Sequence, residues 1–219
     1  MTRIHLTYGG RIEPLSEPGD RRGRMKQTLE RLLVAAARRL DGPAETVMRR
    51  PRVRALLRRR ALHAWRGDDA PLILCYGNIN RSAFAAGLAQ ARGREGARSA
   101  GFYPVEDRPA PDATVACALT FGVDLAGHRS RRVTRRDTKE AQAIFVFDLE
   151  NLARVAALDP AALARTHLLG ALDDDTCVLI EDPHGRGQDV LDVTIKRIAR
   201  AIEGGEIPRG DSVGASRVV

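Results

Sequence analysis

The chain has 219 residues, 43% of them hydrophobic, which is enough for one α/β domain with an appendage. No apolar stretch approaches the roughly 20 residues of a membrane-spanning helix. The three cysteines, Cys75, Cys117 and Cys177, match neither a disulfide framework nor a zinc site, so we expect a cytoplasmic protein without a membrane span. The net charge of +8 is uneven: residues 1–70 hold 17 Lys and Arg against 8 Asp and Glu, whereas residues 71–219 hold 19 against 20.

Residues 1–70 are predicted to form a basic, mainly helical N-terminal extension. A first helix in RMKQTLERLLVAAARRL should end at Asp41-Gly42-Pro43, because this triplet is typical of a helix stop. A short helical piece over about 44–50 follows, and Pro51 opens a further helix over about 51–66. Helical spacing places two apolar sets on these helices: Met25, Leu29, Leu32, Leu33, Ala36 and Leu40 on the first, and Val53, Leu56, Leu57, Ala61 and Trp65, facing inward, on the last.

The charge of this extension has two readings. The arginines of PRVRALLRRR can form a solvated face on helices that pack against the main domain, or a patch that binds an acidic partner or a phospholipid surface. Nucleic acid is the least favoured partner, because only 4% of the residues are aromatic and no nucleic-acid-binding motif is present. We therefore expect a possible acidic partner for residues 1–66 and no specific nucleic acid.

Residues 71–204 are predicted to form an α/β domain. Strands in PLILCY, ARSAG, AIFVFD and THLLGAL alternate with helices in RSAFAAGLAQARGR, APDATVACALTFG and LENLARVAAL, and a last helix spans about 188–204. This alternation favours a doubly wound, four-stranded parallel sheet flanked by helices. Residues 205–219 are expected to be a flexible tail. Ligands of such sheets bind beyond the carboxyl ends of the strands, where Cys75 is expected.

The segment CYGNINRS, residues 75–82, has the composition of an anion site. A loop that passes from a strand into a helix presents backbone N–H groups at the helix N-terminus. Gly77 allows close approach of an anion, Asn78 tolerates a left-handed backbone, and Arg81 offers a planar two-pronged donor. The same positive field stabilises a thiolate, so Cys75 is predicted to be a nucleophile that attacks phosphorus. Ser82 can then donate a hydrogen bond to its sulfur.

Five segments resemble the low-molecular-weight protein tyrosine phosphatases. LILCYGNINRSAFAAGLA is similar to their active-site loop, and SAGF, FGVDLAGHRSRRVT, IFVFDLENLARV and IEDPHG resemble later segments of the family in the same order. The resemblance covers about residues 71–204 and leaves residues 1–70 unmatched. It implies a cysteine-dependent phosphatase that acts on phosphotyrosine proteins or aryl phosphates, with no metal and no cofactor.

The resemblance also implies roles for single residues. Cys75 would be the nucleophile, Arg81 the phosphate clamp and Asp182 the general acid and base. Asn78, Ser99 and His128 would form a network that holds the loop, with Ser82 beside the sulfur. The phosphate-binding and loop-supporting positions are then Tyr76, Gly77, Asn78, Ile79, Asn80, Ser82, Ser99 and His128. Asp148 opens a helix and is expected to act only as its cap. Cys117 and Cys177 are expected to be small core residues.

Three departures from the family pattern are visible. Asn80 replaces a second cysteine in the loop, which removes a protective disulfide partner for Cys75, and Ala83 replaces a proline. His184-Gly185 stands where many members carry tyrosines that form a wall of the substrate slot. An alternative wall is expected from Tyr76, Ile79, Phe102 or Tyr103.

Two other functions remain open at this point. Arsenate reductases that share the fold require resolving cysteines in a relay, and neither Cys117 nor Cys177 lies in a recognisable one. A non-catalytic phosphopeptide-binding module would use the loop without turnover, although Cys75, Arg81, Ser82 and Asp182 are all present.

Overall fold

The central sheet has four parallel strands. In a computed structural model that describes residues 21–175 and 177–206, their order is β2-β1-β3-β4. The strands are β1 (Leu72–Cys75), β2 (Arg98–Gly101), β3 (Ile144–Val146) and β4 (Thr166–Leu168). The predicted parallel, doubly wound sheet is therefore confirmed, although β4 is shorter than THLLGAL, because Leu169–Leu172 turns into a 3₁₀ helix (η2).

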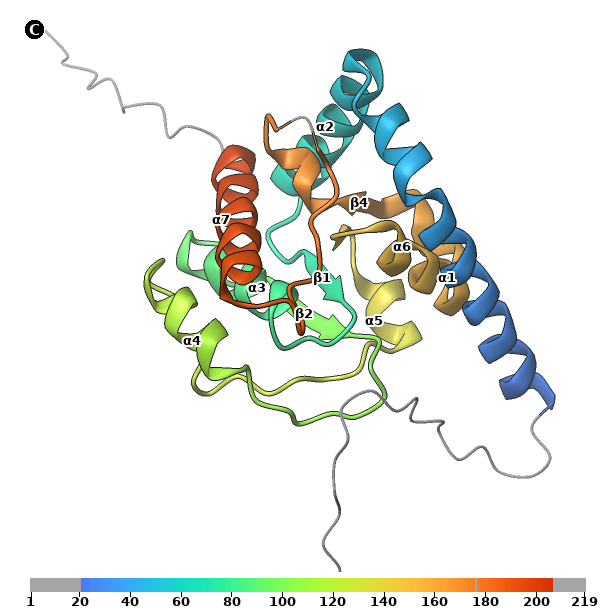
Figure 1. Ribbon diagram of the computed structural model, residues 1–219, viewed down its shortest axis with the longest axis horizontal. Coiled ribbons are helices and arrows are strands. Elements are labelled where there is room, and N and C mark those ends of the chain that lie inside the picture. Colours follow the sequence, from blue (N-terminus) through green and yellow to red (C-terminus); the bar gives the residue numbers. More distant parts are fainter. Residues whose placement is uncertain (1–20, 176, 207–219) are drawn as a thin grey trace, which may run out of the picture.

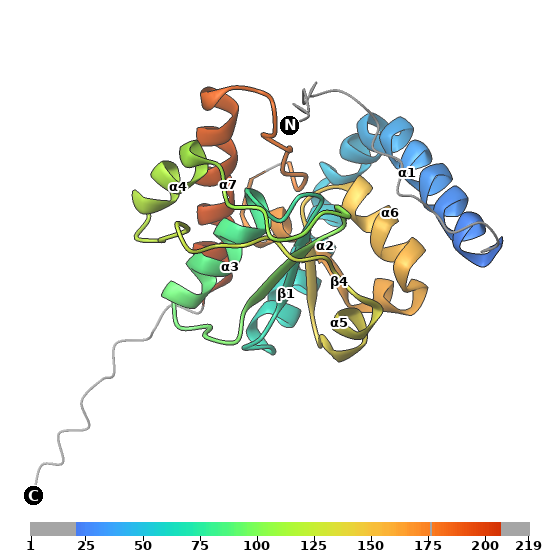
Figure 2. The same ribbon diagram turned by 90° about the horizontal axis from the view of Figure 1, so that it is seen from below.

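Helices cover both faces of this sheet. They are α3 (Arg81–Ala91), α4 (Asp112–Leu119), α5 (Arg135–Glu140), α6 (Leu149–Leu158) and α7 (Gln188–Gly205), with a further 3₁₀ helix η1 (Pro160–Arg165). Figure 2 shows α3, α4 and α7 on one side and α6 on the other. The short α5 was not predicted; a capping box formed by Thr134 and Asp137 starts it. Gly205, expected in the tail, ends α7, and residues 207–219 lie outside the described part.

The two central strands place the functional loop. All residues of β1 and β3 are buried, as expected for parallel strands covered on both faces. β1 continues through α3 to β2 on one side, whereas β3 lies on its other side. The carboxyl end of β1 is thus the switch point at which ligands of such sheets bind. Cys75 is the last residue of β1, so it stands at this point.

The N-terminal helix α1 spans Arg21–Met48 without interruption, so the predicted stop at Asp41-Gly42-Pro43 is wrong. Proline inside a helix removes one hydrogen bond and costs about 3 kcal/mol. Packing on both sides of Pro43 offsets this cost, because Val34 and Ala37 before it and Met48 after it are buried. Most of the apolar side chains that helical spacing groups together on α1 are not buried against the domain, because Met25, Leu29, Leu32 and Leu40 are exposed. Figure 1 shows α1 beside α6.

The helix α2 (Pro51–Arg66) begins at Pro51, as predicted, and packs against β4 and η2. Ala61 and Trp65 are buried, and the ring of Trp65 meets Phe145 of β3 edge-on with centroids 5.1 Å apart. Leu56, expected to face inward, is instead 48% exposed, because the docked face of α2 is narrower than its apolar pattern. The extension therefore completes the core of the α/β domain.

Replacing Trp65 with alanine should lower the free energy of unfolding by about 3–5 kcal/mol, because a fully buried aromatic side chain leaves a cavity. Urea denaturation of the full chain measures this change. The matched control is Leu56→Ala on the same helix, whose exposed side chain should change stability by less than about 0.5 kcal/mol. Equal losses in both variants would contradict the packing of α2 described above.

In the part of the chain that the structure describes, every helix is too short or too polar to cross a membrane.

Candidate active site

The loop between β1 and α3 has the strained shape that the sequence predicts. Asn78 has a φ of 51°, in the left-handed region that few residues other than glycine adopt. The neighbouring strand approaches so closely that a Cβ on Gly101 would lie 2.7 Å from the carbonyl oxygen of Tyr76. The α3 helix begins at Arg81, so its first N–H groups lie at the end of this loop. The result is a helix N-terminus beside the thiol of Cys75.

Two donors surround the sulfur of Cys75. The backbone N–H of Asn78 donates to Sγ at 3.2 Å, and the Ser82 hydroxyl lies 3.0 Å from it. Cys75 is buried, and Ser82 is fully buried. The sulfur therefore lies within hydrogen-bonding distance of a backbone N–H in the loop and of a hydroxyl in the first turn of α3.

The predicted supporting residues meet at Asn78. Its side-chain amide nitrogen donates to Ser82 Oγ at 3.0 Å and to Ser99 Oγ at 2.9 Å. His128 Nε2 donates to the Asn78 carbonyl at 2.7 Å. The structure therefore brings Asn78, Ser82, Ser99 and His128 into one hydrogen-bonded cluster. Arg131, which the sequence reasoning missed, adds its backbone N–H to Asn78 Oδ1 at 3.0 Å.

Asn80 ties the loop to α4. Its side-chain oxygen accepts a hydrogen bond of 2.7 Å from Thr114 Oγ1, and both side chains are buried. Sequence reasoning counted Asn80 among the loop positions, in the place of a second cysteine, but had no signal for Thr114, which lies 34 residues away. The Asn80 amide thus links the loop to α4 at the position where the family pattern has a second cysteine.

The guanidinium of Arg81 is 1% exposed and lies between two aspartates. Nη1 donates to Asp148 at 2.6 Å and to the Ile180 carbonyl at 3.0 Å, and Nη2 donates to Asp182 at 2.6 Å. Burial lowers the pKa of Arg81, but the charges of Asp148, Asp182 and Cys75 outweigh it, so the pKa is raised and the cation persists. Its Nε is buried and has no hydrogen-bond partner among the described residues. A buried donor left unpaired costs roughly 1–3 kcal/mol.

Asp148 does more than the sequence suggested. One carboxylate oxygen caps α6 by accepting from the Asn151 N–H at 2.6 Å, as expected. The other pairs with Arg81. The expectation that Asp148 is only a cap is therefore wrong, because β3 lies beside β1 and their carboxyl ends meet. That adjacency is a property of the sheet order and is absent from the local pattern.

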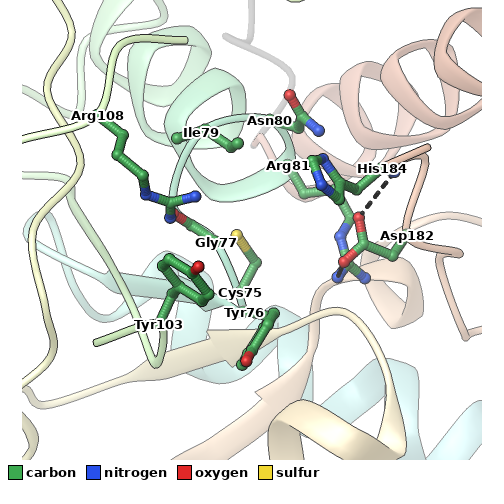
Figure 3. A pocket seen from close by; sticks show the side chains of 10 residues that line it. All are labelled: Cys75, Tyr76, Gly77, Ile79, Asn80, Arg81, Tyr103, Arg108, Asp182 and His184. Carbon is green, nitrogen blue, oxygen red and sulfur yellow. Dashed lines mark hydrogen bonds and ion pairs between the residues drawn. The ribbon is translucent and has the colours of Figure 1, made fainter. Parts of the chain in front are cut away.

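Asp182 reaches the same place from the Asp-Pro turn. Its Oδ2 pairs with Arg81, and its Oδ1 accepts from the His184 N–H at 3.2 Å. The Asp182 side chain is 40% exposed, so it stands at the mouth of the site. Figure 3 shows it facing the cavity opposite Tyr103.

A cavity of about 190 Å³ collects these groups. Its lining residues are Cys75, Tyr76, Gly77, Ile79, Asn80, Arg81, Tyr103, Arg108, Asp182 and His184. Of the four candidates for an aromatic or apolar wall, Tyr76, Ile79 and Tyr103 line the cavity, whereas Phe102 does not. Because a cavity of about 150 Å³ holds a benzene ring, this one has room for an aryl group.

Arg108 is a lining residue that the sequence reasoning missed. Its guanidinium stacks 4.1 Å above the ring of Tyr103 and donates to the Gly77 carbonyl in the loop. It therefore joins one wall of the cavity to the loop and adds positive charge to the mouth. The sequence offers no local signal for it, since Arg108 lies in an irregular segment before Pro109.

The remaining cysteines lie away from the cavity. Cys117 and Cys177 are half-buried, which differs from the core positions expected for them. Cys117 faces Asp192, and Cys177 donates to Glu45 of α1 at 3.1 Å. Neither lines the cavity. Across the described residues, His, Cys, Asp and Glu side chains form no group of three able to hold a metal ion.

Comparison with known proteins agrees with this geometry. A family model described as low molecular weight phosphotyrosine protein phosphatase matches residues 72–204. Among curated proteins, the low molecular weight protein-tyrosine-phosphatase Etp of Escherichia coli (strain K12) is 32% identical over 133 residues, which covers 59% of this chain and 87% of Etp. The family match begins at residue 72 and therefore does not include α1 or α2.

Solved structures show the same fold. The tyrosine phosphatase Wzb from Escherichia coli K30, in complex with sulphate, aligns with a TM-score of 0.57 at 25% identity, over 62% of this chain and 94% of Wzb. The Erwinia amylovora tyrosine phosphatase AmsI aligns with a TM-score of 0.59 at 22% identity, over 63% of this chain and 91% of AmsI.

Proposed function

Because the chain belongs to the low molecular weight phosphotyrosine protein phosphatase family, we propose that it hydrolyses phosphotyrosine in proteins, and other aryl phosphates, through a phosphocysteine on Cys75. The observation that carries the proposal is the buried guanidinium of Arg81, which lines one cavity together with Cys75 and Asp182. A phosphoryl oxygen is a suitable acceptor for this cation. Wzb, which shares the fold, is described in complex with sulphate, a tetrahedral anion like phosphate.

The first step transfers the phosphoryl group to the enzyme. Cys75 Sγ attacks phosphorus, so an S–P bond forms while the bond to the aryl oxygen breaks. Asp182, in its carboxylic acid form, donates its proton to the departing phenolate. Arg81 and the N–H groups of the 76–82 loop stabilise the charge on the transferred group, and no metal is required for this.

The second step releases phosphate. Asp182, now a carboxylate, takes a proton from a water molecule whose oxygen attacks phosphorus. The S–P bond breaks, and Cys75 leaves as a thiolate with inorganic phosphate as the other product. The Ser82 hydroxyl and the Asn78 N–H, 3.0 and 3.2 Å from the sulfur, support the proposal because they stabilise that leaving group. Ser99 and His128 then act as positioning residues that hold Asn78.

The walls of the cavity favour an aryl substrate. Tyr76 and Tyr103 meet edge-on with ring centroids 5.6 Å apart, and both line the cavity beside Cys75. We propose that they take the place of the tyrosines that His184-Gly185 lacks. Aromatic rings stack on one another or meet edge to face, so this wall suits the ring of phosphotyrosine.

Arsenate reduction is the weaker candidate. It requires a second thiol that can reach Cys75, and Cys117 and Cys177 line other parts of the molecule. A phosphopeptide-binding module would have no use for Asp182 at the mouth of the cavity. The product that is released distinguishes both alternatives from hydrolysis.

The full chain should release para-nitrophenol and one equivalent of inorganic phosphate from para-nitrophenyl phosphate in the presence of EDTA. Inorganic phosphate should inhibit competitively, because it occupies the same Arg81 donors. Binding of phosphate without turnover would contradict the proposal and support a binding module. Arsenate reduction coupled to a thiol reductant would support the other alternative.

The acidic partner proposed for residues 1–66 can be tested by comparing phosphotyrosine protein substrates of different charge. α2 contains no acidic residue and exposes Arg52, Arg59, Arg60 and Arg66. We propose that this face attracts acidic protein substrates, so an acidic protein should be hydrolysed faster than a neutral one at low salt, with the difference lost at high salt. Small aryl phosphates, which are too short to reach α2, are the control.

A further inference from the structure

The ring of Tyr76 is held from outside the cavity by Arg154 of α6. The Arg154 guanidinium lies 4.4 Å above the Tyr76 ring, a distance typical of a cation–π contact. The edge of the same ring meets Tyr103, so Tyr76 has a neighbour on two sides. Figure 3 shows Tyr76 and Tyr103 beside Cys75. The ring of an aryl phosphate whose phosphorus faces the sulfur would lie against them. The orientation of this wall therefore depends on where Arg154 sits.

Arg154 is in turn placed by carboxylates from two helices. Nη2 pairs with Glu150 of its own helix at 2.7 Å, and Nη1 pairs with Glu30 of α1 at 2.5 Å. The Arg154 side chain is only 13% exposed, which distinguishes these contacts from ordinary surface ion pairs. Glu30 thus supplies a contact from the N-terminal extension to Arg154 of α6.

A second pair from α1 reinforces this arrangement. Arg38 Nε donates to the other carboxylate oxygen of Glu150 at 2.8 Å. Burial raises the pKa of Glu150, but hydrogen bonds and charge from Arg38 and Arg154 outweigh it, so the pKa is lowered and Glu150 stays ionised. Glu30, Arg154, Glu150 and Arg38 therefore alternate in sign along one network. Half of its members come from α1, which lies outside the residues 72–204 matched by the family.

We propose that the N-terminal extension orients one wall of the substrate slot: Glu30 positions Arg154, and Arg154 holds the Tyr76 ring in the orientation that contacts the aryl group. The proposal rests on the proposed function for its substrate class. It assigns Glu30 and Arg154 as positioning residues for aryl specificity, acting through Tyr76 and not through the phosphate cradle. Binding of the phosphate group itself should therefore be independent of Glu30.

Two ligands separate these effects. Phenylphosphonate carries the ring and cannot be hydrolysed, whereas methylphosphonate carries only the anion. Isothermal titration calorimetry on the full chain should show that Glu30→Gln raises the Kd of phenylphosphonate about threefold to tenfold, the range expected for a lost cation–π contact. The Kd of methylphosphonate should change by less than about twofold. Glu45→Gln is the matched control: Glu45 lies on the same helix and pairs with Arg49, away from the cavity.

A double-mutant cycle tests the route. In a Tyr76→Ala background, Glu30→Gln should have no further effect on phenylphosphonate, because the ring through which it acts is gone. In a Tyr76→Phe background the ring remains, so the effect should persist. A second double-mutant cycle, with Arg154→Gln in place of Glu30→Gln, should give the same result.

Three outcomes would overturn the inference: an unchanged Kd of phenylphosphonate in folded Glu30→Gln, an equal effect with and without the Tyr76 ring, or an equal effect on methylphosphonate. Thermal unfolding of each variant confirms that it is folded. Because binding is measured without turnover, failure of this inference is separate from failure of the hydrolase proposal, which is judged by phosphate release. In an active enzyme, Glu30→Gln should also raise KM for para-nitrophenyl phosphate while changing kcat less.

Discussion

Replacing Cys75 with serine should abolish hydrolysis of aryl phosphates, with a fall in kcat of about 10⁴-fold or more, the scale that follows removal of a catalytic nucleophile. A serine hydroxyl is a much weaker nucleophile than the thiol it replaces, even though Ser82 and the Asn78 N–H remain beside the side chain at this position. Steady-state release of para-nitrophenol from the full chain measures the loss.

The matched control for this prediction is Cys117→Ser. Its sulfur faces Asp192 on the surface of α7 and does not line the cavity, so activity should be retained within about twofold. Phosphate should still bind to Cys75→Ser, since Arg81 and the loop N–H groups remain. Turnover by Cys75→Ser at the rate of the unaltered protein would remove the phosphocysteine mechanism.

Replacing Asp182 with asparagine should slow hydrolysis by about 10²–10⁴-fold for substrates with poor leaving groups, because general acid catalysis contributes on that scale. Phenyl phosphate has such a leaving group, whereas 2,4-dinitrophenol departs readily without a proton. The ratio of kcat values for the two substrates should therefore change strongly in the variant. Equal slowing of both would contradict the general-acid role.

This variant has a second expected consequence. Asp182 pairs with Nη2 of Arg81 in the structure, so its carboxylate competes with a phosphoryl oxygen for the same cation. An asparagine carries no charge, and inorganic phosphate should inhibit Asp182→Asn at a lower concentration than the unaltered protein. Asp124→Asn, at an exposed turn position, is the control for both measurements.

The strand and helix order was predictable because its signals are local. The short apolar runs at β1 and β3 and the cap at Asp148 each depend on a few neighbouring residues. The α1 helix was not predictable in the same way. Asp41-Gly42-Pro43 carries a genuine stop signal, which is overridden by burial of Met48 on its far side. Local propensity is weak compared with packing of this extent.

The candidate site likewise contains features that local sequence predicts and features that it does not. The 75–82 loop follows from local sequence alone, since a strand end, an asparagine tolerant of positive φ and a helix start lie within eight residues. The groups that converge on this loop are instead set by tertiary contacts. The sheet order brings Asp148 to Arg81, the connection after β2 carries Arg108 to Gly77, and docking of α1 sets Glu30 against Arg154. These contacts join residues 31 to 124 positions apart, so no local pattern encodes them.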